Sequence, residues 1–204
     1  MQLPAEDYIR KLIMLENAVG ANIKYRILDP LPFNPGDIIE LQKVAKKIAD
    51  FIGLDGLTFI VAIAKQKEKQ GGHVELQAEQ KEVFIEISDD TAKFPEAVLA
   101  TLSHEITHKY LQINGVSVGS SPVNEYENEV LTDVTTVSLG LGKRMLNGCY
   151  VENTRHEFRA DGTYNVTESL KSGYLEREQL AFVYQVVCAM RGISSKDMLS
   201  ELSQ

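Results

Sequence analysis

The segment from Pro95 to about Ile113 constrains the fold most, because no helix breaker interrupts it. Proline suits the first turn of a helix, and the pair Asn114 and Gly115 supplies a stop signal at the other end. Directly before it, EVFIEIS at 82–88 alternates apolar residues with mostly polar ones, as a half-exposed strand does. The sequence therefore predicts a long helix entered directly after an amphipathic strand.

Further helix-like and strand-like segments place the chain in the α+β class. The loop AEQK at 78–81 favours an antiparallel hairpin, and KQKEKQ at 65–70 is interpreted as a solvated hairpin loop. Asp37 and Glu40 have the spacing of a capping box, and residues 148–174 look irregular or form short strands. Helices are predicted over 5–19, from Asp37 to about 52, over 125–146 and 176–192, and from Ser195, and strands over 23–28, 57–64, 73–77 and 82–88.

The predicted helix over 125–146 contains a conflict. VTTVSLGLG at 134–142 is rich in β-branched residues and glycine, which favours a strand by intrinsic propensity. An acidic start and an apolar stripe through Val130, Val134 and Leu141 favour a helix. With the helix retained, Gly140 and Gly142 are expected to permit close packing on a neighbouring helix.

Charge and apolar runs exclude several classes of protein. A net charge of -8 argues against a nucleic-acid groove, which needs a surplus of Lys and Arg. The longest apolar run, LTFIVAIA at 57–64, is far shorter than the roughly 20 residues of a membrane helix. The N-terminus lacks the basic start and apolar stretch of a secretory signal, so the expected compartment is the cytoplasm.

The sequence indicates one domain and contains no cysteine motif. Neither an internal repeat nor a long linker divides the chain, so residues 1–204 are predicted to form a single domain. Cys149 and Cys188 lack CxxC spacing, so neither a disulfide framework nor a thiolate zinc knuckle is predicted. The sequence makes no prediction about the oligomeric state.

The long helix carries HEITH, which holds half of the chain's 4 histidines. His104 and His108 share one helix face, so both can bind one zinc ion at about 2.0–2.1 Å. Glu105 can then reach a metal-bound water as a general base. Lys109 is expected to point outward or to lie along the rim. The alternative is a half-exposed helix whose histidines have no function.

A catalytic zinc needs a third protein ligand, and NEVLTD at 128–133 offers one. On a helix, Glu129 and Asp133 share a face, so Glu129 could bind the metal while Asp133 accepts a hydrogen bond from a liganding histidine. Glu125 is a rival ligand, with Glu129 four positions later. Glu129 is preferred because only it has Asp133 one turn later.

HEITH followed by NEVLTD resembles the motif pair of the gluzincin zinc metallopeptidases, whose members include the thermolysin-like enzymes. The resemblance implies a Zn²⁺ site of His104, His108 and Glu129, with Glu105 as catalytic base and Asp133 orienting His104. It also implies a zincin-like fold. In that fold a small, mostly antiparallel sheet places an edge strand over the active-site helix, and a mainly helical C-terminal part follows. EVFIEIS is the expected edge strand, against which a peptide or protein substrate pairs.

An oxyanion that develops during amide hydrolysis needs a hydrogen-bond donor. His156, in NTRHEFRAD, is a candidate, with Tyr150 and Tyr164 nearby in the sequence. A surface histidine without a catalytic role is the alternative for His156. His73 is expected at a strand end, with no catalytic role.

The leading hypothesis is a zinc-dependent peptidase that hydrolyses peptide bonds by metal-activated water, with Glu105 as general base. A zinc-binding scaffold or regulatory protein, which keeps the site without general proteolytic activity, is the alternative. A metal-free α+β binding domain is the third interpretation. The expected partners are peptides or proteins, and neither nucleic acid nor a membrane.

Overall fold

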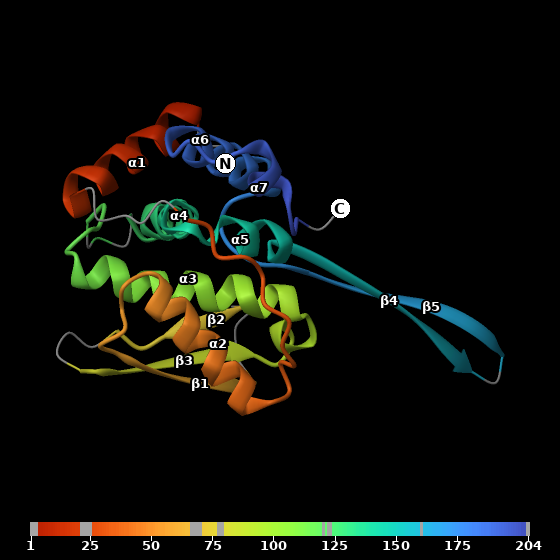
Figure 1. The fold of residues 1–204 in the computed structure, drawn as a ribbon. Coiled ribbons are helices and arrows are strands. Elements are labelled where there is room, and N and C mark those ends of the chain that lie inside the picture. The colour runs from red at the N-terminus through yellow and green to blue at the C-terminus, as the bar shows by residue number, and fades with distance from the viewer. Residues whose placement is uncertain are drawn as a thin grey trace.

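The computed structural model describes residues 4–20, 26–65, 71–76, 80–119, 121, 124–159 and 161–202, and the following statements refer to these residues. The fold is mixed α and β, as predicted (Figure 1). None of the helices in these ranges is long and apolar enough to cross a membrane. The elements are α1 (Ala5–Val19), α2 (Ile38–Phe51), β1 (Thr58–Ala64), β2 (Gly72–Val74), β3 (Glu82–Ser88), a 3-10 turn (Thr91–Lys93), α3 (Pro95–Ile113), α4 (Glu125–Thr136), a π-type turn (Val137–Leu141), α5 (Gly142–Gly148), β4 (Tyr150–Arg159), β5 (Gly162–Lys171), α6 (Arg177–Met190) and α7 (Ser195–Leu199).

The larger sheet has three strands in the order β1, β3, β2. β1 pairs with β3 in parallel and β2 pairs with β3 antiparallel, so the expectation of a mostly antiparallel sheet is wrong. EVFIEIS, as β3, is the central strand, and the edge strand beside α3 is β2. The alternation in EVFIEIS indicates that one face of the strand is buried. It does not indicate whether the strand pairs with one neighbour or with two, so the edge position could not be predicted from it.

The connection between β1 and β2 also differs from the prediction. These strands lie on opposite sides of β3, so residues 65–70 do not close a hairpin between paired strands. Most of that run, residues 66–70, lies outside the described residues. The antiparallel pairing of β2 with β3 is confirmed.

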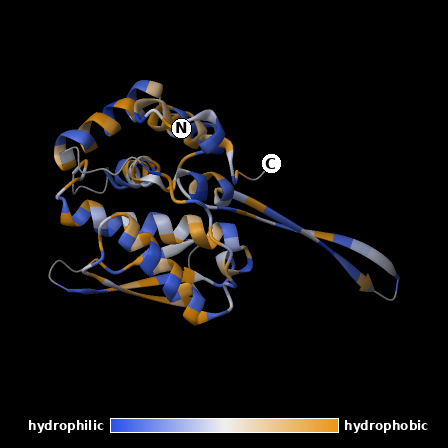
Figure 2. Cartoon of the chain, viewed as in Figure 1, coloured by the Kyte–Doolittle hydropathy of each residue, from blue (hydrophilic) through white to orange (hydrophobic). Residues whose placement is uncertain are grey.

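Helices α2 and α3 pack on the same side of this sheet and build the main core (Figures 1 and 2). The buried face of β3 contributes Val83, Ile85 and Ile87, which the alternation identified. On α2, the Gln42 side chain donates to the carbonyl of Val61 at 2.6 Å and accepts from its N–H at 3.1 Å. This pairing covers the outer edge of β1 and leaves β2 as the open edge.

The start of α2 tests the sequence signals. Asp37 caps α2 through the N–H groups of Ile39 and Glu40, as predicted. The capping box is incomplete, because the Glu40 carboxylate accepts from the N–H of Asn34 at 2.7 Å and not from Asp37. The predicted helices that became α1, α3, α6 and α7 are confirmed.

The helix predicted over 125–146 is interrupted at Gly140, which has φ +90° inside the π-type turn. A Cβ at Gly140 would lie 2.1 Å from the carbonyl oxygen of Arg26, whereas Gly142 faces the Tyr184 ring on α6. The expected close approach to a helix is therefore confirmed for Gly142, whereas Gly140 lies closest to the Arg26 backbone, with the Phe51 ring of α2 3.3 Å from its Cβ position. Residues 26–28 of the predicted first strand are not in a strand, and Leu28 donates its N–H to the Gly140 carbonyl at 2.9 Å.

Residues 148–174 are more regular than predicted, because β4 and β5 form a long antiparallel hairpin that projects from the helices (Figure 1). Most side chains on β5 are exposed. A strand solvated on both faces needs no apolar alternation, so the sequence lacked the usual strand signal.

Gly140→Ala is expected to lower the free energy of unfolding by about 3 kcal/mol or more. A side chain at positive φ costs about 1–2 kcal/mol, and overlap with the Arg26 backbone adds about 1–3 kcal/mol. Gly53→Ala is the matched control, because Gly53 has φ +86° and nothing within 4 Å of its Cβ position. Urea denaturation measures both variants, and equal losses would contradict the close contact at Gly140.

Candidate metal centre

The two histidines of HEITH lie in the second half of α3 and point to one place. Their Nε2 atoms are 3.0 Å apart, and their rings meet edge to face. His104 is buried and His108 is partly buried. The spacing of four residues therefore places both rings on one face of the helix, as expected from the sequence.

Glu129 on α4 completes a cluster that could hold a metal ion. Its Oε2 atom lies 3.0 Å from His104 Nε2 and 3.2 Å from His108 Nε2. A tetrahedral ion with bonds of about 2.0–2.1 Å spaces its ligand atoms about 3.3–3.4 Å apart, close to this triangle. The rival ligand, Glu125, lines the same cleft but does not belong to the cluster.

Asp133 fixes the orientation of His104. Its Oδ1 atom lies 2.8 Å from His104 Nδ1, and its Oδ2 atom accepts the N–H groups of Tyr174 and Leu175 at 2.8 and 2.9 Å. A fully buried carboxylate with these partners accepts, so His104 Nδ1 carries the proton. The lone pair of His104 Nε2 therefore faces the cluster.

Thr132 orients His108 in the same way. The Thr132 hydroxyl donates to the carbonyl of Asn128 at 2.9 Å, so its oxygen accepts from His108 Nδ1 at 3.3 Å. Two imidazole lone pairs and one carboxylate oxygen then face one another. Three acceptors so close need a positive charge between them, which fits a metal cation.

The pKa shifts agree with this requirement. Burial lowers the pKa of His104, but hydrogen bonds to Asp133 and Glu129 raise it well above its ordinary value. Burial raises the pKa of Glu129, but the two histidines outweigh it and lower that pKa to about 2. Both shifts describe a site that favours a positive charge between His104 and a Glu129 carboxylate that stays ionised.

Glu105 lies beside the cluster and is not part of it. Only 7% of its surface is exposed, and burial raises its pKa, which makes the carboxylate a stronger base. A Cβ at Gly72 on β2 would lie 3.1 Å from Glu105 Oε1 and 2.5 Å from Thr101 Cγ2. Glycine at this position therefore lets the edge strand approach Glu105 closely.

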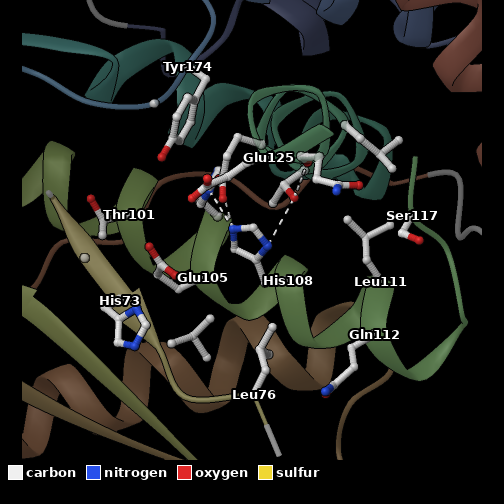
Figure 3. Close-up of a pocket in the computed structure, with 18 of the residues that line it drawn as sticks. His73, Leu76, Thr101, Glu105, His108, Leu111, Gln112, Ser117, Glu125 and Tyr174 are labelled. Carbon is white, nitrogen blue, oxygen red and sulfur yellow. Dashed lines mark hydrogen bonds and ion pairs between the residues drawn. The ribbon is translucent and has the colours of Figure 1, made fainter. Parts of the chain in front are cut away.

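The cluster opens into a cleft with a volume of about 1080 Å³ (Figure 3). Its walls include residues of β2, α3 and α4, Lys171 at the end of β5 and the segment 172–174 that follows it. His73, for which no catalytic role was predicted, lies on β2 and lines the cleft. The cleft therefore borders both the cluster and the edge strand β2.

Tyr174 is a cleft residue that the sequence analysis did not identify. Its ring stacks on His104, with centroids 5.9 Å apart, and it lies across the cleft from Glu105 (Figure 3). Burial raises the pKa of Tyr174 to about 12, so its hydroxyl stays protonated and can donate a hydrogen bond. No local pattern distinguished it, because it reaches the site through the fold of the β4–β5 hairpin.

The structure does not bring His156 to this cluster. His156 is exposed on β4, where its Nδ1 atom lies 2.7 Å from Asn165 Oδ1 on β5, and it does not line the cleft. Tyr150 and Tyr164 lie on the same hairpin and are also absent from the cleft lining.

Lys109 is buried, contrary to the expectation that it points outward or lies along the rim. Its Nζ atom donates to Gln112 Oε1 at 2.8 Å. Most side chains of α3 are buried because the sheet, α4 and α5 surround this helix, so no solvated rim is available there.

Glu129→Ala is expected to lower the affinity for zinc by at least about 100-fold, because it removes one of three ligands. Glu125→Ala, the matched control in the same cleft, should retain the wild-type affinity. Competition with a chromogenic chelator measures both variants. Loss of zinc in Glu125→Ala and not in Glu129→Ala would contradict the assigned cluster.

Comparisons of the chain with models of protein families, with curated proteins and with solved structures found no match. The assignment of the metal centre therefore rests on the geometry of His104, His108 and Glu129.

Proposed function

We propose that this protein is a zinc-dependent peptidase in which His104, His108 and Glu129 hold the zinc and Glu105 is the general base. The observation that carries the proposal is the convergence of two oriented imidazole lone pairs and a carboxylate oxygen beside a second, buried carboxylate. The resemblance of HEITH and NEVLTD to the gluzincin motif pair supports it. The arrangement fits the motif pair, because α3 bears the two histidines and the base, and α4 bears the third ligand.

Zinc is the metal that this set of ligands favours. Two histidines and one glutamate are a usual ligand set of catalytic zinc sites, which keep a fourth position open. The cleft beside the cluster gives access to such a position. A zinc ion acts as a Lewis acid that polarises a carbonyl and lowers the pKa of water.

Glu105 and Tyr174 would carry out the proton transfer and the charge stabilisation. Glu105 accepts a proton as the oxygen of a water molecule bonds to the carbonyl carbon, and it then gives this proton to the leaving amine as the C–N bond breaks. The Tyr174 hydroxyl donates a hydrogen bond to the developing oxyanion. Asp133 keeps His104 in the required tautomer throughout.

The open edge of β2 would align the substrate. Ser88 donates to the Gly71 carbonyl and Glu75 donates to the Phe84 carbonyl, so residues 71, 73 and 75 face β3. Gly72 and Val74 face the other way, where an extended peptide can pair with them. This arrangement supports the proposal of a zincin-like site, with β2 in the role that the resemblance gave to EVFIEIS.

Glu105→Gln is expected to retain zinc and to lower the rate of peptide hydrolysis by about 10²–10⁴-fold, because the amide cannot accept the proton. Glu96→Gln, an exposed change of the same kind on α3, should keep the wild-type rate. Metal analysis and cleavage of a fluorogenic peptide library measure the two properties. Wild-type hydrolysis by Glu105→Gln would contradict the mechanism.

Tyr174→Phe is expected to lower kcat by about 10²-fold while KM stays within about threefold of wild type, because the lost hydrogen bond forms in the transition state. Steady-state kinetics on the same peptides measures both constants. A rise in KM at unchanged kcat would instead assign Tyr174 to substrate binding.

The alternative is a zinc-binding scaffold without general proteolytic activity. It predicts a zinc-loaded chain that leaves every member of a mixed peptide library intact. A metal-free binding domain predicts neither zinc after purification nor a change in Tm with a chelator. Metal content and library cleavage together distinguish the three functions.

A further inference from the structure

The hairpin of β4 and β5, residues 150–171, is here named the arm. Its strands pair over their full length, from Tyr150 with Lys171 to Arg159 with Gly162. Only the base packs on the rest of the protein, where Val151 and Leu170 contact the cluster around Phe94. The remainder projects from the helices and is hydrophilic over much of its length (Figures 1 and 2). A two-stranded hairpin in water is marginally stable, so a further strand would stabilise the arm.

The outer edge of β5 offers a continuous row of backbone hydrogen-bonding groups. At the base, the Ser172 N–H donates to the Cys149 carbonyl at 2.9 Å. Inward-facing and outward-facing residues alternate along an antiparallel strand, so the even-numbered residues of β5 face β4. In the described part of the chain this sheet has two strands, and the odd-numbered residues face outward. These are Thr163, Asn165, Thr167, Ser169 and Lys171.

The two edges of the arm differ in how well they are protected from pairing with a strand of another chain. Natural edge strands avoid pairing with other chains through charges, prolines or bulges. β4 carries four charged residues, Glu152, Arg155, Glu157 and Arg159, whereas β5 carries two, Glu168 and Lys171, and none over residues 162–167; neither strand contains a proline. The edge of β5 is therefore the less charged of the two and the one that accepts a strand more readily.

We propose that the occupant of this edge is β5 of a second copy of the chain, which gives a symmetric dimer with a four-stranded sheet. Pairing the whole outward row antiparallel with itself places the two-fold axis at Thr167. Thr163 then lies opposite Lys171 of the second copy and Asn165 opposite Ser169, with hydrogen bonds at each pair. Every outward N–H and C=O of the row receives a partner.

Side chains in this register are compatible on both faces. Thr154 and Thr167 already contact through their hydroxyls at 2.9 Å, so the axis adds a row of four threonines across the sheet. On the other face, Tyr164 lies opposite Leu170 and Val166 opposite Glu168. No pair places like charges opposite each other.

The charge distribution favours contact through the arms. The arm has four acidic and three basic residues, so its net charge is -1 against -8 for the whole chain. The acidic character therefore belongs to the rest of the protein, from which the arm projects (Figure 1). Contact at the arms joins two copies while their acidic parts stay apart.

Sedimentation equilibrium of the full chain tests the dimer. Thr167→Pro should raise the dimer dissociation constant by about tenfold or more, because it removes the N–H at the axis in both copies. Thr154→Pro is the matched control, since Thr154 is the cross-strand partner of Thr167 on the opposite edge. This control should change the constant by less than about threefold. A wild-type chain that stays monomeric, or equal effects of the two prolines, would overturn the proposal.

Charge substitutions at the axis test the register without proline. Thr167→Lys and Thr167→Glu should each give monomers, because each puts two like charges opposite each other. A mixture of the two variants should form the dimer again. A mixture that remains monomeric would overturn the pairing about Thr167.

Discussion

The carboxylate of Asp133 is the contact on which the site depends, because it joins three parts of the chain. It lies on α4 without exposure to solvent, accepts from His104 of α3, and binds the N–H groups of Tyr174 and Leu175 before α6. One buried group thus sets the tautomer of His104 in the candidate metal centre and places Tyr174 over the cleft. A buried carboxylate without these donors would be strongly unfavourable, so the three segments are held together by its hydrogen bonds.

The local parts of the site could be predicted from the sequence. Residues four positions apart on a helix share a face. This places His104 beside His108 on one helix and Glu129 beside Asp133 on the next. Helical periodicity is a property of neighbouring residues, so these relations hold whatever surrounds the helices. The choice of Glu129 over Glu125 rested on the same periodicity, and the cluster contains Glu129.

What the sequence did not predict depends on contacts between distant segments. The position of EVFIEIS between two strands, the burial of Lys109 and the approach of Tyr174 to His104 are set by tertiary packing. The length and regularity of the β4–β5 arm were not predicted for another reason, since most of its side chains are solvated and no apolar period marks it. At Gly140, a helix-like stripe was overridden by a backbone contact with Arg26.

In the proposed centre, two imidazoles and one carboxylate surround a single cation. X-ray absorption spectroscopy of the zinc-loaded chain measures this environment directly. The expected result is a shell of nitrogen and oxygen ligands at about 2.0–2.1 Å, with multiple scattering from two imidazoles and no sulfur. A sulfur shell at about 2.3 Å, or a spectrum without imidazole scattering, would contradict the account.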